Sequence, residues 1–163
     1  MTVPTPARIA APLSVLMCPP THFAVTYSIN PWMDPDAPVD RDRALAQWNA
    51  LRETYLALGF DVALIDPVPG LPDMVFAANG GLVVDGLAYT ASFAHAERRD
   101  EAPAYRAWFA AAGLDVVDST VVNEGEGDFL VVGDAILAGT GFRSTAASHA
   151  ELASVVGREV VPL

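Results

Sequence analysis

The segment GGLVVDGLAYTA, residues 80–91, and the segment GDFLVVGDAILAG, residues 127–139, decide the predicted fold. Each reads as two short apolar strands joined by a turn that contains Asp and Gly. Each is followed by a helical stretch that ends at a glycine, Gly113 or Gly157, and then by a final apolar strand. An offset of about 48 residues between the two copies lies in the range of stacked or propeller-like repeats.

The first third of the chain follows a similar plan. It offers a strand at 13–17, a long proline-rich loop, a helix at 40–58 that ends at Gly59, and a strand at 61–65. We therefore expect an α/β domain of about three repeats, at roughly 13–66, 72–118 and 124–163, after an N-terminal arm at 1–12. An ordinary α/β domain whose connections match by chance is the alternative.

Composition limits the class of protein and of partner. The chain has 163 residues, of which 52% are apolar and 18% charged, as expected for one globular domain with a buried core. The net charge of −11 disfavours nucleic acid and anionic membranes and favours a cationic ligand. No apolar run approaches the ~20 residues that span a bilayer, and the single cysteine, Cys18, excludes an internal disulfide. A cytoplasmic protein is the default expectation.

Acidic residues stand where the second and third repeats begin. Asp73 opens the segment PDMVFAAN, which ends at Asn79, and the segment EGEGD places Glu126 and Asp128 just before the next hairpin. Glycine disfavours a solvated helix here and permits close approach of the backbone. We therefore expect Glu126 and Asp128 to point toward one ligand.

The ligand follows from the charges. Carboxylates form paired hydrogen bonds with a planar guanidinium group, while Arg143 could hold a carboxylate, so an amino acid with a guanidino tail fits both ends. A hard cation such as Mg²⁺ or Ca²⁺, held by Asp73, Glu126 and Asp128, is the alternative. Against it, the spacing of the acids matches no calcium loop and the nearby arginine opposes a metal. We expect neither a metal nor a cofactor.

The segments PDMVF (72–76), EGEGD (124–128) and GTGFRS (139–144) resemble the guanidine-modifying enzymes, which include dimethylarginine dimethylaminohydrolases, arginine deiminases and dihydrolases, and amidinotransferases. The resemblance runs from Leu13 to the C-terminus. The segments YSINPWM (27–33) and FAAN (76–79) are most similar to the arginine dihydrolase-like branch. The resemblance implies a pentein-type propeller of five ββαβ units around a polar site, of which this chain holds about three.

The resemblance also implies roles for individual residues. Asp73, Glu126 and Asp128 are expected as active-site acids, one of the latter two orienting a catalytic histidine. Substrate contacts are expected from Asn30, Phe76, Asn79, Arg98 and Arg143, with Arg143 gripping the substrate carboxylate. Simpler structural alternatives exist for four positions: a turn for Asp73, a solvated charge at a helix start for Arg98, a core site for Phe76 and a loop cap for Asn30.

The family's mechanism needs a cysteine nucleophile and a histidine acid/base, both expected after Leu163. Cys18 is expected to be an inert thiol, and His22, His95 and His149 to be structural or solvated. Two hypotheses follow. The chain is the substrate-orienting half of an enzyme that converts arginine or a related amino acid to ornithine or citrulline and ammonia. Alternatively, it is a non-catalytic binding module that associates with itself or with a C-terminal half.

Overall fold

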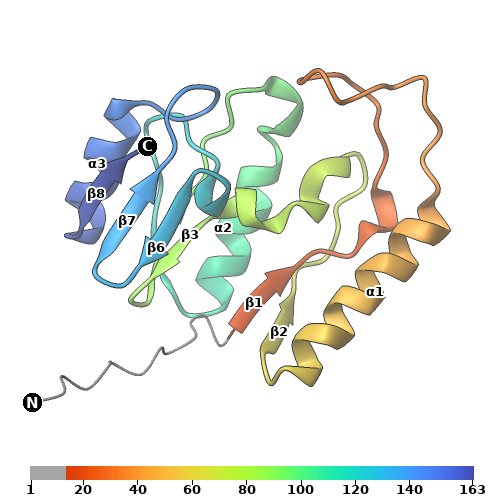
Figure 1. Cartoon of the computed structure of the whole chain (residues 1–163), viewed down its shortest axis with the longest axis horizontal. Coiled ribbons are helices and arrows are strands. Elements are labelled where there is room, and N and C mark those ends of the chain that lie inside the picture. Colours follow the sequence, from red (N-terminus) through yellow and green to blue (C-terminus); the bar gives the residue numbers. More distant parts are fainter. Residues whose placement is uncertain (1–13) are drawn as a thin grey trace, which may run out of the picture.

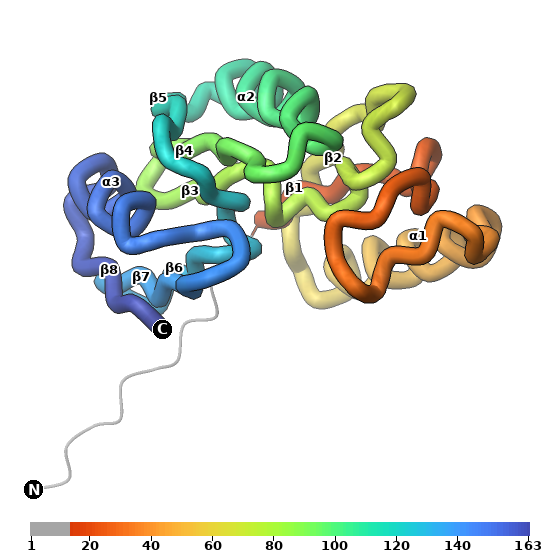
Figure 2. Tube along the Cα trace, turned by 90° about the horizontal axis from the view of Figure 1, so that it is seen from above, coloured from red at the N-terminus to blue at the C-terminus, as the bar shows by residue number. Residues whose placement is uncertain are grey.

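The computed structural model describes residues 14–163, so the predicted arm and Leu13 lie outside the described residues. Within these described residues, three small sheets follow one another around an arc (Figures 1 and 2). The α/β class is confirmed. The strands are β1 Ser14–Met17, β2 Asp61–Leu64, β3 Gly81–Val84, β4 Leu87–Thr90, β5 Asp115–Val117, β6 Phe129–Val132, β7 Ala135–Ala138 and β8 Glu159–Pro162. The α-helices are α1 Arg41–Ala57, α2 Glu101–Ala111 and α3 Ala146–Val156.

The second and third sheets have the same topology. The hairpin strands β3 and β4 are antiparallel, and β5 returns parallel to β4; β6, β7 and β8 repeat this order. Asp85 and Gly86 turn the first hairpin with φ angles of 51° and 81°, the positive values that a two-residue hairpin turn requires. In the part of the chain that the structure describes, the first sheet consists of β1 and β2, which run parallel.

Neighbouring sheets share their buried side chains. One apolar cluster joins the first and second sheets around Cys18, Met74, Tyr105 and Phe109. A second cluster joins the second and third sheets around Tyr89, Phe129, Ile136 and Leu152. Each fully buried large apolar side chain stabilises the fold by about 1.5–3 kcal/mol. The repeats are therefore held together by side chains that neighbouring repeats contribute jointly.

Helix α1 differs from the other two helices. Asp40 caps its N-terminus by accepting a hydrogen bond from the backbone N–H of Arg43 at 2.9 Å. Yet α1 buries no residue, and Leu45, Leu51, Leu56 and Leu58 are exposed. Among the apolar residues of α1, Ala44, Trp48 and Tyr55 are half-buried.

Short 3₁₀ turns carry the loops that approach the site. They are η1 Pro20–His22, η2 Pro72–Val75, η3 Ala77–Gly80, η4 Ala96–Arg98 and η5 Gly125–Gly127. Among residues 14–163, no helix is long and apolar enough to cross a membrane.

Candidate active site

A cavity of about 400 Å³ lies where the loop after β1 meets η2, η3 and the loop after β7. Its walls combine aromatic, amide and charged side chains, as in many sites for small polar ligands. The lining residues are Phe23, Val25, Ile29, Asn30, Trp32, Met33, Asp73, Phe76, Asn79, His95, Arg98, Glu124, Phe142 and Arg143.

Arg98 organises the floor of this cavity. Its guanidinium group donates to both carboxylate oxygens of Glu101, at 2.9 and 2.8 Å, and to Oε2 of Glu124 at 3.1 Å. It also donates to Oδ1 of Asn79 at 3.0 Å and to the carbonyl of Asp73 at 3.3 Å. With only 4% of its surface exposed, Arg98 is not the solvated helix-start charge that was the alternative. One buried cation thus fixes four segments relative to one another.

Arg143 lies at the other side of the same acids. It contacts Glu124 and Asp128, each at 2.7 Å, and donates to the carbonyl of Gly127 at 3.1 Å. Asp128 also accepts from the hydroxyl of Ser144 and from the backbone N–H of Glu124. An arginine has five N–H donors, and these contacts leave Nε–H and one Nη1–H of Arg143 for another partner.

Asp73 is held from above by the loop after β1. The hydroxyl of Tyr27 donates to Oδ2 of Asp73 at 2.8 Å, and Nε of Arg98 lies 3.8 Å from the same oxygen. Burial, and then the hydrogen bond to Asp73, raise the pKa of Tyr27, so the phenol keeps its proton. Tyr27 therefore ties the loop to the cavity floor.

The site carries excess negative charge. Four carboxylates, those of Asp73, Glu101, Glu124 and Asp128, surround the two guanidinium groups. Burial raises the pKa of Glu101 and of Glu124, although the neighbouring arginines oppose this effect. The pKa of Arg98 is raised, because its acidic partners outweigh burial. With all groups ionised, the cluster carries a net charge of −2, which favours a cationic ligand.

The structure brings most of the predicted site residues together. The cavity is lined by Asp73, Asn79, Arg98 and Arg143. Asp128 does not line it but forms an ion pair with Arg143, which does. Asp73 does lie in the short turn η2, but its carboxylate is buried and paired.

Phe76 and Asn30 also line the cavity. Phe76 is 49% exposed, so the alternative of a core site is wrong, and its ring meets that of Phe23 edge to face with centroids 6.1 Å apart. Asn30 caps its own loop by accepting from the backbone N–H of Trp32 at 3.0 Å. The loop-cap alternative therefore holds alongside a place in the cavity wall.

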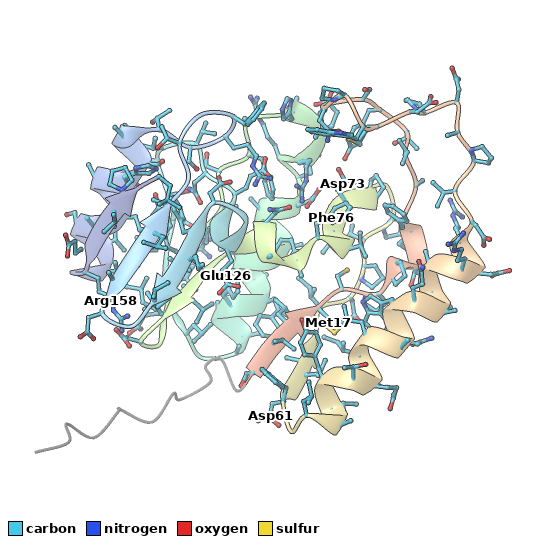
Figure 3. All side chains as sticks on the ribbon, in the orientation of Figure 1. Met17, Asp61, Asp73, Phe76, Glu126 and Arg158 are labelled. Atoms are coloured by element: carbon cyan, nitrogen blue, oxygen red, sulfur yellow. The ribbon has the colours of Figure 1, made fainter. Side chains whose placement is uncertain are left out.

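Glu126 is not brought together with the other acids. Figure 3 shows it apart from Asp73, and it lines a second groove, which shares Phe76 and Asn79 with the cavity but includes neither Glu124 nor Arg143. Gly125, with φ of 54°, turns the chain so that Glu124 and Glu126 point to different places. The expected convergence of Glu126 and Asp128 on one ligand is therefore wrong, and Glu124 occupies the place expected of Glu126.

Sequence reasoning missed four residues of the site. Glu124 was visible as the first acid of the EGEGD segment, but nothing in the sequence separates it from Glu126. Glu101 follows Arg98 by three residues, a spacing that suits an ion pair near a helix start. Tyr27 and His95 carry no local signal, because only the tertiary fold brings them to the cavity.

Cys18 and the other two histidines lie elsewhere. Cys18 is fully buried, and burial, with smaller contributions from Glu101 and Asp66, raises its pKa to about 12, which opposes a nucleophilic role. His149 is buried, with Nε2 3.0 Å from the carbonyl of Gly139. Within residues 14–163 no group of His, Cys, Asp and Glu side chains is arranged to hold a metal ion.

Comparison with known proteins adds to this geometry. No protein-family model matches the chain. It is 52% identical over 147 residues to a dimethylarginine dimethylaminohydrolase of Mycobacterium tuberculosis, covering 90% of this chain and 49% of the relative. It is 40% identical over 160 residues to ArgZ of Synechocystis, a bifunctional arginine dihydrolase/ornithine cyclodeaminase, covering 95% of this chain and 23% of ArgZ. The chain belongs to the guanidine-modifying superfamily.

Solved structures of this superfamily agree in fold. The N-terminal domain of ArgZ, solved as a cysteine-to-serine variant with bound substrate, superimposes with a TM-score of 0.86 at 39% identity, covering 92% of this chain and 57% of that one. A dimethylarginine dimethylaminohydrolase at 18% identity has a TM-score of 0.74 and shares the fold. The expected partial pentein fold is confirmed, and the likeness to ArgZ agrees with the dihydrolase-like branch. The chain spans about half, or less, of the length of these curated relatives.

Proposed function

We propose that this chain forms the substrate-orienting part of an enzyme that acts on the guanidino group of arginine or a related amino acid. In this proposal hydrolysis yields citrulline with ammonia, or ornithine with ammonia and carbon dioxide, through a cysteine and a histidine supplied from outside these 163 residues. The observation that carries the proposal is the set of buried carboxylates around Arg98 and Arg143, which leaves the cavity short of positive charge.

Two carboxylate oxygens are available for a ligand. Oδ2 of Asp73 is taken by Tyr27, and Oε2 of Glu124 by the two arginines. Within residues 14–163, no hydrogen bond engages Oδ1 of Asp73 or Oε1 of Glu124, and neither is a fully buried unpartnered atom. A flat guanidinium group can donate to both, because its N–H groups spread in one plane.

The remaining residues suit the rest of an amino-acid substrate. The two free N–H groups of Arg143 can hold the α-carboxylate, and the aromatic rings of Phe76 and Trp32 can cover the aliphatic chain. The relatives support this assignment. ArgZ is named an arginine dihydrolase and its N-terminal domain was solved with its substrate. AgrE, a similar protein from Nostoc, was solved with L-arginine.

Calorimetric titration of the purified chain with arginine and with citrulline tests the proposal. The two amino acids have nearly the same shape, but citrulline is neutral at the end of its side chain. Arginine is expected to bind at least about tenfold more tightly, a difference of about 1.4 kcal/mol. Glu124→Gln should remove this preference, and Glu126→Gln, whose side chain does not line the cavity, should retain it. Equal binding of both amino acids by the unmodified chain contradicts the proposal.

A second candidate function is a non-catalytic module that completes its fold by association. The exposed apolar residues of α1 and of β6, among them Leu51, Leu130 and Val132, favour it. Arginine turnover after addition of a C-terminal half separates the two candidates. Activity supports the enzyme, whereas a stable inactive complex supports the module. A cytoplasmic location stays a prediction.

A further inference from the structure

The loop that carries Arg143 has few anchors of its own. This Arg143 loop, residues 139–145, connects β7 to α3 (Figure 1). Within residues 14–163, no backbone hydrogen bond involves Phe142 or Arg143, and one bond crosses the loop, from the N–H of Gly141 to the carbonyl of Ser144 at 3.0 Å. The place of Arg143 therefore depends on how the two ends of the loop are held.

Gly139, at the start of the loop, is held on both sides of its backbone. Its N–H donates to the backbone carbonyl of Asp128 at 2.9 Å, and its own carbonyl lies 3.0 Å from Nε2 of His149 in the first turn of α3. The side chain of Asp128 holds the other end of the loop, because it accepts from the hydroxyl of Ser144. Asp128 and His149 thus fix the base of the loop from two directions.

The surroundings of His149 decide which ring nitrogen carries the proton. The side chain is buried, with 5% of its surface exposed, and within residues 14–163 Nδ1 has no hydrogen-bond partner. The carbonyl of Gly139 can only accept. A proton on Nδ1 alone would bury an unpartnered N–H and turn the lone pair of Nε2 toward the carbonyl oxygen. The neutral ring with its proton on Nε2 is therefore the form that fits.

The His149 ring is itself fixed in place. It meets the buried ring of Phe129 in β6 edge to face, with centroids 6.1 Å apart and an angle of 78° between the planes. The turn before it is fixed as well, because the backbone N–H of Thr145 donates to the hydroxyl of Ser148 at 3.1 Å. The Nε2–H donor therefore has a defined position to which Gly139 must come.

Packing alone does not explain a histidine at this place. A polar ring costs free energy when it is buried unless its polar atoms are hydrogen-bonded, and an apolar ring would pack against Phe129 without that cost. Of the two ring nitrogens of His149, only Nε2 has a partner, the carbonyl of Gly139. The bond to the Arg143 loop is thus the contact that requires a histidine.

We propose that His149 is a positioning residue for substrate binding. Its Nε2–H holds the carbonyl of Gly139 and so keeps the Arg143 loop where Arg143 can grip the α-carboxylate of the substrate. His149 is not among the residues that line the cavity, so it acts through Arg143 rather than on the ligand. The inference rests on the proposed function, in which Arg143 holds that carboxylate.

Two variants and two ligands test the proposal by calorimetry. His149→Phe keeps an aromatic ring but lacks the donor, whereas His149→Gln keeps an N–H donor at a similar reach. Agmatine is arginine without its carboxylate. His149→Phe should weaken arginine binding at least about tenfold and agmatine binding by less than about twofold, and His149→Gln should restore arginine binding to within about threefold of the unmodified chain.

Val155→Ala separates positioning from general stability. Val155 lies on the same helix and packs, partly buried, against the cluster that joins the second and third sheets. Its truncation should lower the melting temperature, since apolar contacts are lost, but should leave the ratio of arginine to agmatine affinity unchanged. A merely structural role for His149 predicts the same pattern for His149→Phe.

Nuclear magnetic resonance tests the contact without any ligand. Long-range ¹⁵N–¹H correlation of the unmodified chain should show that Nε2 of His149 carries the proton and that Nδ1 does not. In His149→Phe, the heteronuclear Overhauser effects of the Phe142 and Arg143 amides should fall, because the loop gains motion on the picosecond to nanosecond timescale. If His149→Phe does not fold, the protonated nitrogen of the unmodified chain decides.

Three outcomes overturn the proposal: a proton on Nδ1 instead of Nε2, equal losses of arginine and agmatine binding in His149→Phe, or unchanged arginine binding and loop order in that variant. Failure of the proposed function looks different. An unmodified chain that binds neither ligand contradicts the proposed function, while the protonated nitrogen and the order of the Arg143 loop still decide whether His149 holds that loop.

Discussion

Arg98 and Glu101 form a two-bond ion pair in the interior, with Nε to Oε1 at 2.9 Å and Nη2 to Oε2 at 2.8 Å. Glu101 has no exposed surface and Arg98 has 4%. The pair fixes the plane of the guanidinium group, so that its remaining N–H groups reach Asn79 and Glu124. The floor of the site therefore depends on a residue that does not line the cavity.

Glu101→Gln should destabilise the chain by about 3–5 kcal/mol, because it leaves a buried charge without its main partner. Urea unfolding measures this change. The matched control is Asp118→Asn, whose pair with Arg106 is about half exposed on both sides and should contribute only about 0–1 kcal/mol. Equal effects of the two variants would contradict a structural role for Glu101.

Arg143→Ala should weaken arginine binding by about 2–5 kcal/mol if Arg143 holds the substrate carboxylate. Agmatine, which has the guanidino tail without the carboxylate, should bind the variant no more weakly than the unmodified chain. Calorimetry measures both ligands. Arg158→Ala, which removes a pair with Asp85 away from the cavity, is the control. Identical arginine titrations before and after Arg143→Ala remove Arg143 from the site.

Tyr27→Phe removes the hydrogen bond to Asp73 and should weaken arginine binding by about 1–2 kcal/mol, since a hydrogen bond to a carboxylate is lost. Tyr55→Phe on α1 is the control, because that ring packs against Phe60 away from the cavity. Isothermal titration of both variants gives the comparison. An unchanged affinity in Tyr27→Phe shows that the loop does not act through Asp73.

The burial of Cys18 predicts a pH dependence of stability. Its pKa is raised from 9.0 to about 12, so the native thiol stays protonated while the unfolded thiol ionises. The resulting stabilisation is fully present below pH 9 and is lost as pH rises from about 9 to 12. As pH rises from about 9 to 12, the unfolding free energy of the unmodified chain should therefore fall toward that of Cys18→Ala, which has no thiol to ionise. Parallel curves would mean that the thiol titrates normally.

Gly125→Ala should destabilise the fold by more than about 1 kcal/mol. A side chain there would collide with the backbone of Gly81, and φ at Gly125 is 54°. Gly133→Ala provides a matched control, since φ is 59° but the space around it is open. Chemical unfolding should show a larger loss for Gly125→Ala. Equal losses would show that backbone conformation alone accounts for the effect.

The sequence predicted the repeated elements well, because their signals are local. The Asp-Gly turn at Asp85 and Gly86 and the short apolar runs on either side of it define the hairpin of β3 and β4 without tertiary information. The partners of a charge are not local. Whether Arg98 is solvated or buried depends on Glu101, Glu124 and Asp73 meeting in space. Glu101 alone has a spacing that suits a pair with Arg98, and no spacing rule links Glu124 or Asp73 to it.

The sequence also does not show which of Glu124 and Glu126 belongs to the site, although the two residues are close neighbours in the chain. The two residues are separated by one glycine, and the positive φ of Gly125 decides which carboxylate turns toward Arg98 and Arg143. Glycine permits either sign of φ, so the sequence leaves both orientations open.

Tyr27, Asn30 and Trp32 belong to the first repeat and reach the cavity only through the loop after β1. The floor, in contrast, comes from residues between Asp73 and Arg143. Within the cavity, the loop after β1 is therefore joined to the floor by the hydrogen bond of Tyr27 to Asp73 and by the edge-to-face contact of Phe23 with Phe76. Exchanging the loop after β1 between relatives should therefore change which arginine derivatives bind while the charged floor stays the same. This offers a route by which specificity can diverge or be engineered.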